Sequence, residues 1–245
     1  MAYGEGMGSP LKTVGIDRGD KVTRLEAFVD ASFAFALTLL VISVDAVPAS
    51  VEELTVALKQ IPTYVLSFNL IAQFWSTHAR WSRWFGIDEE VSDRISLFLV
   101  LVLLIFVYPL KMVFSAFFHA ISGGWLPASF TLQADTDLLL MFQVFAVGYG
   151  TMAMLVAMLF GRALRLADKL GLSALERLLA RHHRSNWWVV AGFCGLSFLL
   201  ATFMPPALQT GQWLGLPGYI LFSLFVFQFV RWRVFKRQVA RLPTG

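Results

Sequence analysis

The sequence carries little charge for its length. Only 15% of its 245 residues are charged, 57% are hydrophobic, and the mean hydropathy is +0.66. A soluble domain has about 25% charged residues, so the composition excludes a chain that folds mainly in water. A helix that crosses a membrane needs about 20 largely apolar residues. Six such stretches predict an all-α, polytopic membrane protein: 27–47, 55–78, 95–118, 136–160, 187–206 and 214–232.

Little sequence remains outside these stretches, so a second domain is not expected. Residues 1–20 are polar, aperiodic and contain glycine, which predicts a mobile cytoplasmic tail. The six-helix membrane domain is expected to occupy 21–236, and 237–245 a second cytoplasmic tail. The single cysteine, Cys194, lies inside a span, which excludes an intrachain disulfide.

Lysine and arginine are absent from alternate connections. The connections 46–54, 119–135 and 207–213 contain neither residue, whereas the other connections and both ends are basic. Basic segments stay in the cytoplasm, so the pattern predicts a protein of the cell inner (plasma) membrane with both termini cytoplasmic. The pI near 9.4 then reflects topology and contact with anionic headgroups of the bilayer, and no nucleic-acid partner is expected.

The long basic connection 162–184 alternates leucines with arginines and lysines. Ser173 and Glu176 have the spacing of a capping box, which predicts that a helix starts there. This helix is expected either to lie along the cytoplasmic interface or to be an ordinary solvated loop helix under the bundle. Pro109 predicts a kink in the third span, and Pro205 with Pro206 predicts the end of the fifth.

Enzyme signatures are absent. The sequence has no H-E-x-x-H, G-x-S-x-G or phosphate-binding G-x-x-x-x-G-K-[ST] pattern, so no enzyme activity and no cofactor are expected. His182 and His183 have no neighbouring cysteine or carboxylate cluster, so no resident metal is expected. Residues 146–150, Ala-Val-Gly-Tyr-Gly, approach the T-V-G-Y-G filter of potassium channels, but the apolar run continues through them. They are therefore interpreted as part of a span, with Gly148 and Gly150 as close-packing positions.

An ionisable residue inside a span is costly and marks a candidate functional site. Asp30 lies one to two turns inside the first span, and Arg24 is six positions away, too far round the helix to pair with it. The second span supplies candidate hydrogen-bonding partners at similar depth: Asn69, Gln73, Trp75, Ser76 and His78. This polar cluster either has a functional role or only holds the helices together.

The first span has two distinct faces. Phe28, Phe35, Leu39 and Ile42 form a bulky stripe, and Ala27, Ala31, Ala34 and Thr38 form a small one beside it. Small residues permit a close neighbour. Periodicity alone leaves open whether the bulky stripe meets lipid or another part of the protein.

These residues resemble a known family. Arg24-x-x-x-Phe28-x-Asp30 is similar to the R-x-x-x-F-S-D signature of the transmembrane protein 175 family of potassium channels. Phe74-Trp75-Ser-Thr-His78-Ala-Arg80 resembles the F-W-x-x-H-H-R pattern of its prokaryotic six-span members. The chain departs from the patterns at Val29 and Ala79, and Phe35 stands where isoleucine or leucine is usual.

The resemblance implies a homotetramer around a central pore lined by the first helix, conducting potassium or other monovalent cations passively. Carried over by position, the apolar constriction rings are Phe35, Leu39 and Ile42, with Thr38 beside them. A structural network that braces this helix would comprise Arg24, Phe28, Asp30, Trp75 and His78. The alternative is a secondary transporter or proton-conducting protein in which Asp30 and His78 titrate.

Overall fold

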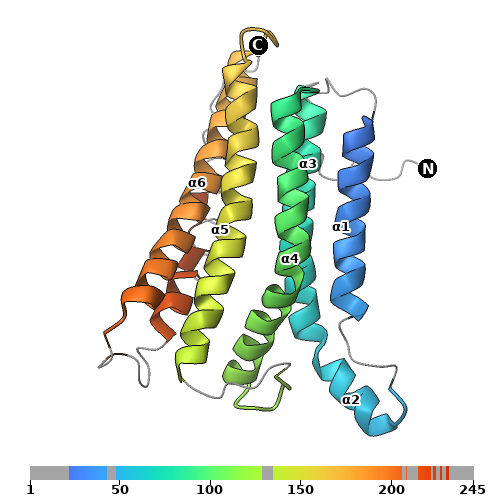
Figure 1. The fold of residues 1–245 in the computed structure, drawn as a ribbon, viewed down its shortest axis with the longest axis vertical. Coiled ribbons are helices and arrows are strands. Elements are labelled where there is room, and N and C mark those ends of the chain that lie inside the picture. Colours follow the sequence, from blue (N-terminus) through green and yellow to red (C-terminus); the bar gives the residue numbers. More distant parts are fainter. Residues whose placement is uncertain are drawn as a thin grey trace, which may run out of the picture.

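The computed structural model describes residues 22–42, 48–128 and 135–205, and also 208, 215–221, 223, 224, 227, 230 and 231; of Ile42 and Asp135 it describes the backbone alone. Every regular element in this part is helical, which confirms the all-α prediction (Figure 1). The helices are α1 (Arg24–Ile42), α2 (Val51–Lys59), α3 (Ile61–Phe85), α4 (Glu90–Ile121), α5 (Asp135–Arg165) and α6 (Ala174–Phe203).

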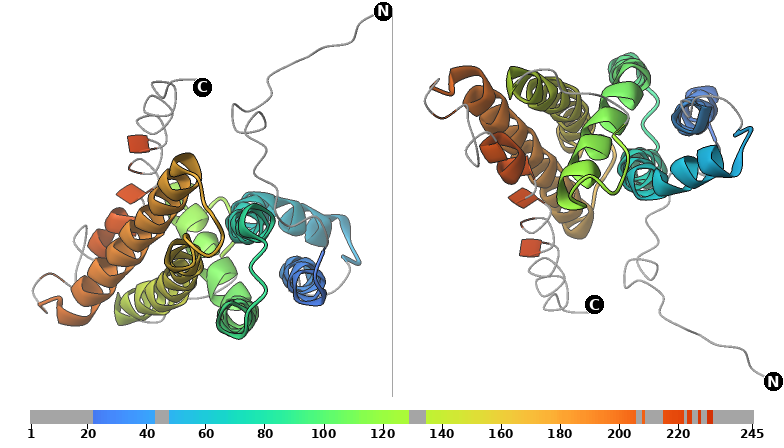
Figure 2. Two further views of the ribbon diagram at one scale, coloured as in Figure 1. Left: turned by 90° about the horizontal axis from the view of Figure 1, so that it is seen from above. Right: turned by 90° about the horizontal axis from the view of Figure 1, so that it is seen from below.

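The helices form one elongated bundle. Seen along its axis, α1 stands at one edge and α6 at the opposite edge, with α3, α4 and α5 between them (Figure 2). A continuous hydrophobic core runs through it from Phe33 on α1 to Val190 on α6. Among the described residues, α4, 136–165 and α6 are long and apolar enough to cross a membrane. The charges at the start of α1 and the polar residues of α3 make these two helices less apolar than a typical span.

The expected second span, 55–78, differs from the observed helices. The chain forms a short helix, α2, and then begins α3 at Ile61, because Pro62 at the start of α3 has no N–H to continue the preceding helix. Ser50 caps α2 by accepting a hydrogen bond from the Glu53 amide at 3.1 Å. α3 then continues to Phe85, beyond the predicted end, and Gly86 stops it in the left-handed conformation with a φ of 54°.

The structure of the connection 162–184 differs from the sequence prediction. The capping box is present: the Ser173 amide donates to Glu176 Oε2 at 2.6 Å, and the Glu176 amide donates to Ser173 Oγ at 3.3 Å. The helix it starts does not lie along the interface as a separate element, nor is it a loop helix. It is the first part of α6, because no proline or glycine interrupts the chain before Gly192.

The filter-like residues 146–150 lie inside α5, so their backbone carbonyls belong to a helix. Gly148 and Gly150 are close-packing positions, as predicted: a Cβ at Gly148 would stand 2.2 Å from the Phe106 ring, and one at Gly150 2.9 Å from Cys194 Cβ. These glycines let α5 approach α4 and α6 closely. α4 bends in its second half, where Pro109 lies, and α6 ends just before Pro205, as the sequence predicts (Figure 1).

Candidate functional site

α1 buries one face and leaves the other uncovered. Val29, Phe33, Ala36 and Leu40 recur at helical spacing and are at most 1% exposed, because they pack on α3 and α4. The opposite face comprises exposed residues that nothing in the described part of the chain covers: Ala27, Phe28, Ala31, Ala34, Phe35, Thr38 and Val41. The small stripe and half of the bulky stripe thus share one exposed surface at the edge of the bundle (Figure 2).

The expected constriction residues occupy different places on α1. Phe35 lies on the uncovered face and is 56% exposed. Thr38 is beside it, with its hydroxyl donating to the Ala34 carbonyl of its own helix at 2.9 Å. Leu39 is half-buried and packs against the core, so it lies at the margin of that face. The Ile42 side chain lies outside the described residues.

Asp30 is hydrogen-bonded to α3, the helix that contains most of the expected second span. Trp75 Nε1, on α3, donates a hydrogen bond to Asp30 Oδ1 at 2.8 Å, which joins residues 45 positions apart. Two other candidate partners bond to their own helix instead: Asn69 donates to the Val65 carbonyl and Ser76 to the Gln73 carbonyl. A charge-assisted hydrogen bond of this kind fixes the start of α1 against α3.

His78 belongs to a separate contact. Its imidazole is buried, and Nε2 shares a hydrogen bond of 3.0 Å with Ser96 Oγ on α4. The other ring nitrogen, Nδ1, has no hydrogen-bond partner among the residues that the structure describes. Ser96 was not anticipated, because a lone serine in an apolar run gives no signal beyond its polarity. His78 therefore links α3 to α4, while Asp30 links α1 to α3.

Two members of the expected network stay at the surface. Arg24 is exposed and forms no ion pair in the part of the chain that the structure describes, and Phe28 is 53% exposed on the uncovered face. Trp81, which the sequence analysis did not single out, is buried and donates to the Leu159 carbonyl of α5 at 2.9 Å. Together the observed bonds tie α3 to three other helices.

One ion pair fixes the turn between α3 and α4 to α5. Arg162 Nε and Nη2 each donate to one Glu89 carboxylate oxygen at 2.8 Å, and Ser92 Oγ donates to Oε1 at 3.0 Å. The hydrogen bond from Arg162 lowers the pKa of Glu89 below its ordinary value, against the opposing effect of partial burial. The carboxylate is consequently held in its charged form.

A comparison with known families supports the motif resemblance. Residues 24–109 match the family model of the endosomal/lysosomal potassium channel TMEM175. The resemblance to the TMEM175 family is confirmed. The matched residues contain α1, α3 and most of α4, and thus Asp30, Trp75 and His78 together with their observed partners. This resemblance and the apolar helices indicate an integral membrane protein.

Two potassium channels extend the comparison. A protein from Marivirga tractuosa named "Potassium channel" is 28% identical over 165 residues, which cover 65% of this chain and 66% of that protein. The chain thus spans slightly less than two thirds of the length of this curated relative. The crystal structure of the potassium channel MtTMEM175, a T38A variant bound to a nanobody–MBP fusion, has a TM-score of 0.75 and 24% identity, covering 90% of this chain and 96% of that one. This likeness establishes a shared fold.

Proposed function

We propose that the chain is the subunit of a passive cation channel, selective for potassium, whose pore lies at the centre of a homotetramer and is lined by α1. The observation that carries the proposal is the uncovered face of α1 around Phe35 and Thr38. The family match over residues 24–109 and the name of the Marivirga relative support the same function.

The composition of α1 favours copies of the chain over lipid as its neighbours. Its first seven residues include Arg24, Glu26 and Asp30, and its uncovered face includes Thr38 and three alanines. Ionisable groups in a span normally face other protein or water. Small residues let helices approach closely in a membrane. A helix at the edge of the bundle with these properties suits the centre of a symmetric assembly (Figure 2).

Phe35, Leu39 and Ile42 are proposed as the constriction rings, with Thr38 adjacent. An apolar ring narrows a pore and gates it by dewetting, because an ion must lose water to pass. Phe35 is the residue best supported, since its side chain projects from the uncovered face. Leu39 contributes only the part of its side chain that is not packed on the core.

Orientation and location complete the proposal. The ends of α3 and α5 and the starts of α1, α4 and α6 lie at one end of the bundle and carry most of the arginines (Figure 1). We place this end in the cytoplasm of a cell whose inner (plasma) membrane holds the protein, with both termini on that side.

Ion flux into liposomes tests the function. Purified protein should pass potassium down its gradient with no coupled substrate, and crosslinking should give a tetramer. Phe35→Ala should widen the constriction and raise potassium flux or relax selectivity. Phe203→Ala is the matched control, because Phe203 is 75% exposed on α6, at the other edge of the bundle. Proton-coupled transport would favour the alternative based on Asp30 and His78, and unchanged flux in Phe35→Ala would remove Phe35 from the pore.

A further inference from the structure

A cluster of cationic and aromatic side chains lies at the basic end of the bundle, away from the uncovered face of α1. His182 and His183 on α6 have ring centroids 5.8 Å apart, and His183 also contacts Trp84 of α3 at 5.4 Å. The Arg80 guanidinium lies 6.0 Å from the Trp84 ring centroid. This cluster joins α3 to α6, two helices that are far apart in the sequence.

A second guanidinium reaches the same part of α6. Arg231 Nη2 donates to Ser185 Oγ at 2.8 Å, and its guanidinium lies 5.8 Å from the Phe227 ring centroid. Arg80 lies close enough to His183 to repel a positive charge on its ring, and Arg231 does the same for His182. Two arginines from separate segments therefore flank the histidine pair.

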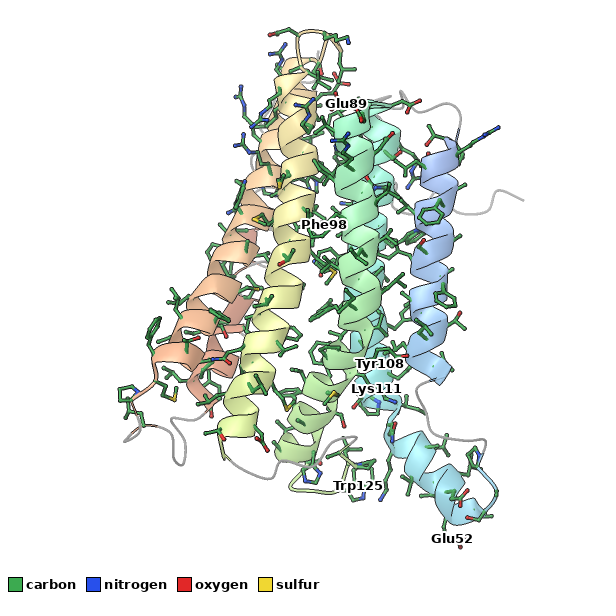
Figure 3. The ribbon with its side chains drawn as sticks, in the orientation of Figure 1. Glu52, Glu89, Phe98, Tyr108, Lys111 and Trp125 are labelled. Carbon is green, nitrogen blue, oxygen red and sulfur yellow. The ribbon has the colours of Figure 1, made fainter. Side chains whose placement is uncertain are left out.

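No carboxylate in the described part of the chain neutralises these arginines. Three carboxylates at this end of the bundle have other partners: Glu89, labelled in Figure 3, binds Arg162, Asp168 binds Arg177, and Glu176 completes the cap of α6. No aspartate or glutamate follows Glu176 in the sequence, although many arginines do. Arg80 and Arg231 therefore keep their charge available to an anion from outside the chain.

The surroundings favour an amphiphilic anion. Trp188, three residues beyond Ser185 towards the apolar part of α6, is 44% exposed, and Phe227 is 37% exposed. Arginine recognises phosphate through paired N–H groups, and basic pockets between membrane helices on the cytoplasmic side bind phospholipid headgroups. Exposed aromatic rings beside such a pocket suit the glycerol and the upper acyl chain.

We propose that Arg80 and Arg231 bind the phosphate headgroup of an anionic phospholipid at the seam between α3, α6 and the segment that carries Arg231, with Ser185 holding the Arg231 side chain in place. In the orientation proposed above, this lipid belongs to the cytoplasmic leaflet. The site is separate from the proposed pore, so binding does not depend on conduction.

Lipid binding to purified, delipidated protein in detergent tests the site. Thermal unfolding is measured with added phosphatidylglycerol or cardiolipin, with phosphatidylcholine, and with inorganic phosphate at matched ionic strength. We expect the two anionic lipids to raise the unfolding midpoint and phosphatidylcholine and inorganic phosphate not to. The double variant R80Q/R231Q should weaken anionic-lipid binding by about tenfold, since each guanidinium–phosphate contact is a charge-assisted hydrogen bond.

R165Q/R181Q is the matched control, because Arg165 on α5 and Arg181 on α6 are exposed and the double variant also removes two positive charges. R80K/R231K keeps both charges, loses the paired N–H geometry and should bind with intermediate affinity. The proposal is overturned if R165Q/R181Q weakens binding as much as R80Q/R231Q, or if inorganic phosphate gives the same shift as the lipids. Native mass spectrometry of retained lipids gives a second readout if R80Q/R231Q is poorly folded. Potassium flux in phosphatidylcholine liposomes tests the channel separately.

Discussion

The two edges of the bundle are held together in different ways. α1 is fixed to α3 by apolar packing and the Asp30–Trp75 hydrogen bond, and one of its faces remains uncovered. α5 and α6 pack on each other over most of their length, and Gly150 brings their backbones close together. The C-terminal edge is thus closely packed, whereas the N-terminal edge keeps polar groups and a face that the described residues leave uncovered.

The largest expected effect concerns the close packing of α5. Gly148→Val should destabilise the protein by about 3 kcal/mol or more, because its side chain would overlap the buried Phe106 ring. Thermal unfolding in detergent measures the change. Gly192→Ala is the control, since a Cβ there meets nothing within 4 Å, and it should be neutral or slightly stabilising. Equal losses of stability in Gly148→Val and Gly192→Ala would show that the overlap with the Phe106 ring does not destabilise the protein.

The Asp30–Trp75 hydrogen bond between α1 and α3 should contribute somewhat less to the stability of the protein. Trp75→Phe removes the indole N–H and leaves Asp30 without its donor, which should cost about 1.5–3 kcal/mol. The unfolding midpoint in detergent is the measurement. Trp188→Phe is the control, because Trp188 is exposed on α6. A double-mutant cycle with Asp30→Ala, which removes the acceptor, should show coupling, and additive effects would mean that the hydrogen bond contributes nothing.

The contact between α3 and α4 should have a smaller effect. Ser96→Ala leaves both nitrogens of the buried His78 ring without a partner and should cost about 1–2 kcal/mol. Ser67→Ala is a matched control, since the buried Ser67 hydroxyl donates only to the Thr63 carbonyl of its own helix. Chemical denaturation compares the two variants. A loss in Ser67→Ala as large as that in Ser96→Ala would contradict the role of the His78–Ser96 bond.

The smallest expected effect is pH-dependent. The pKa of Glu89 is lowered in the folded protein by its hydrogen bond with Arg162. The ion pair therefore stabilises the folded protein fully at pH values above the ordinary pKa of 4.5, and this stabilisation is lost as the pH falls through the lowered pKa. The unfolding midpoint of the wild type should therefore fall more steeply below pH 4.5 than that of Glu89→Gln. Asp88→Asn, a change at the exposed neighbour, should retain the wild-type slope. Parallel curves for the wild type and Glu89→Gln would refute the assignment.

Most of the helices could be predicted from the sequence, because apolar periodicity and helix-breaking residues determine the conformation of neighbouring residues. The start of α6 at Ser173, its end before Pro205 and the helical state of residues 146–150 all follow from neighbouring residues. The division of the second span at Gln60 was missed, because hydropathy averages across a proline. The prediction of a separate helix in 162–184 was wrong, because the change from charged to apolar residues does not end a helix where no proline or glycine interrupts it.

The candidate site was only partly predictable. Polarity and depth narrowed the partners of Asp30 to a small set that contained Trp75. The pairing of His78 with Ser96 depends on how α3 and α4 are rotated about their axes, which a single sequence does not specify. The roles of Phe35, Leu39 and Ile42 depend on neighbouring subunits, so they remain predictions.

The short turn between α5 and α6 has a consequence for biogenesis. Gly171, with a φ of 58°, reverses the chain within a few residues, and the Arg177–Asp168 ion pair spans the turn. Contacts between segments that are close in the sequence form quickly, and contacts between distant segments form more slowly. The Asp30–Trp75 and Trp81–Leu159 hydrogen bonds join residues 45 and 78 positions apart. We therefore expect the C-terminal hairpin to form soon after its insertion, and α3 to complete its contacts only once that hairpin is in place.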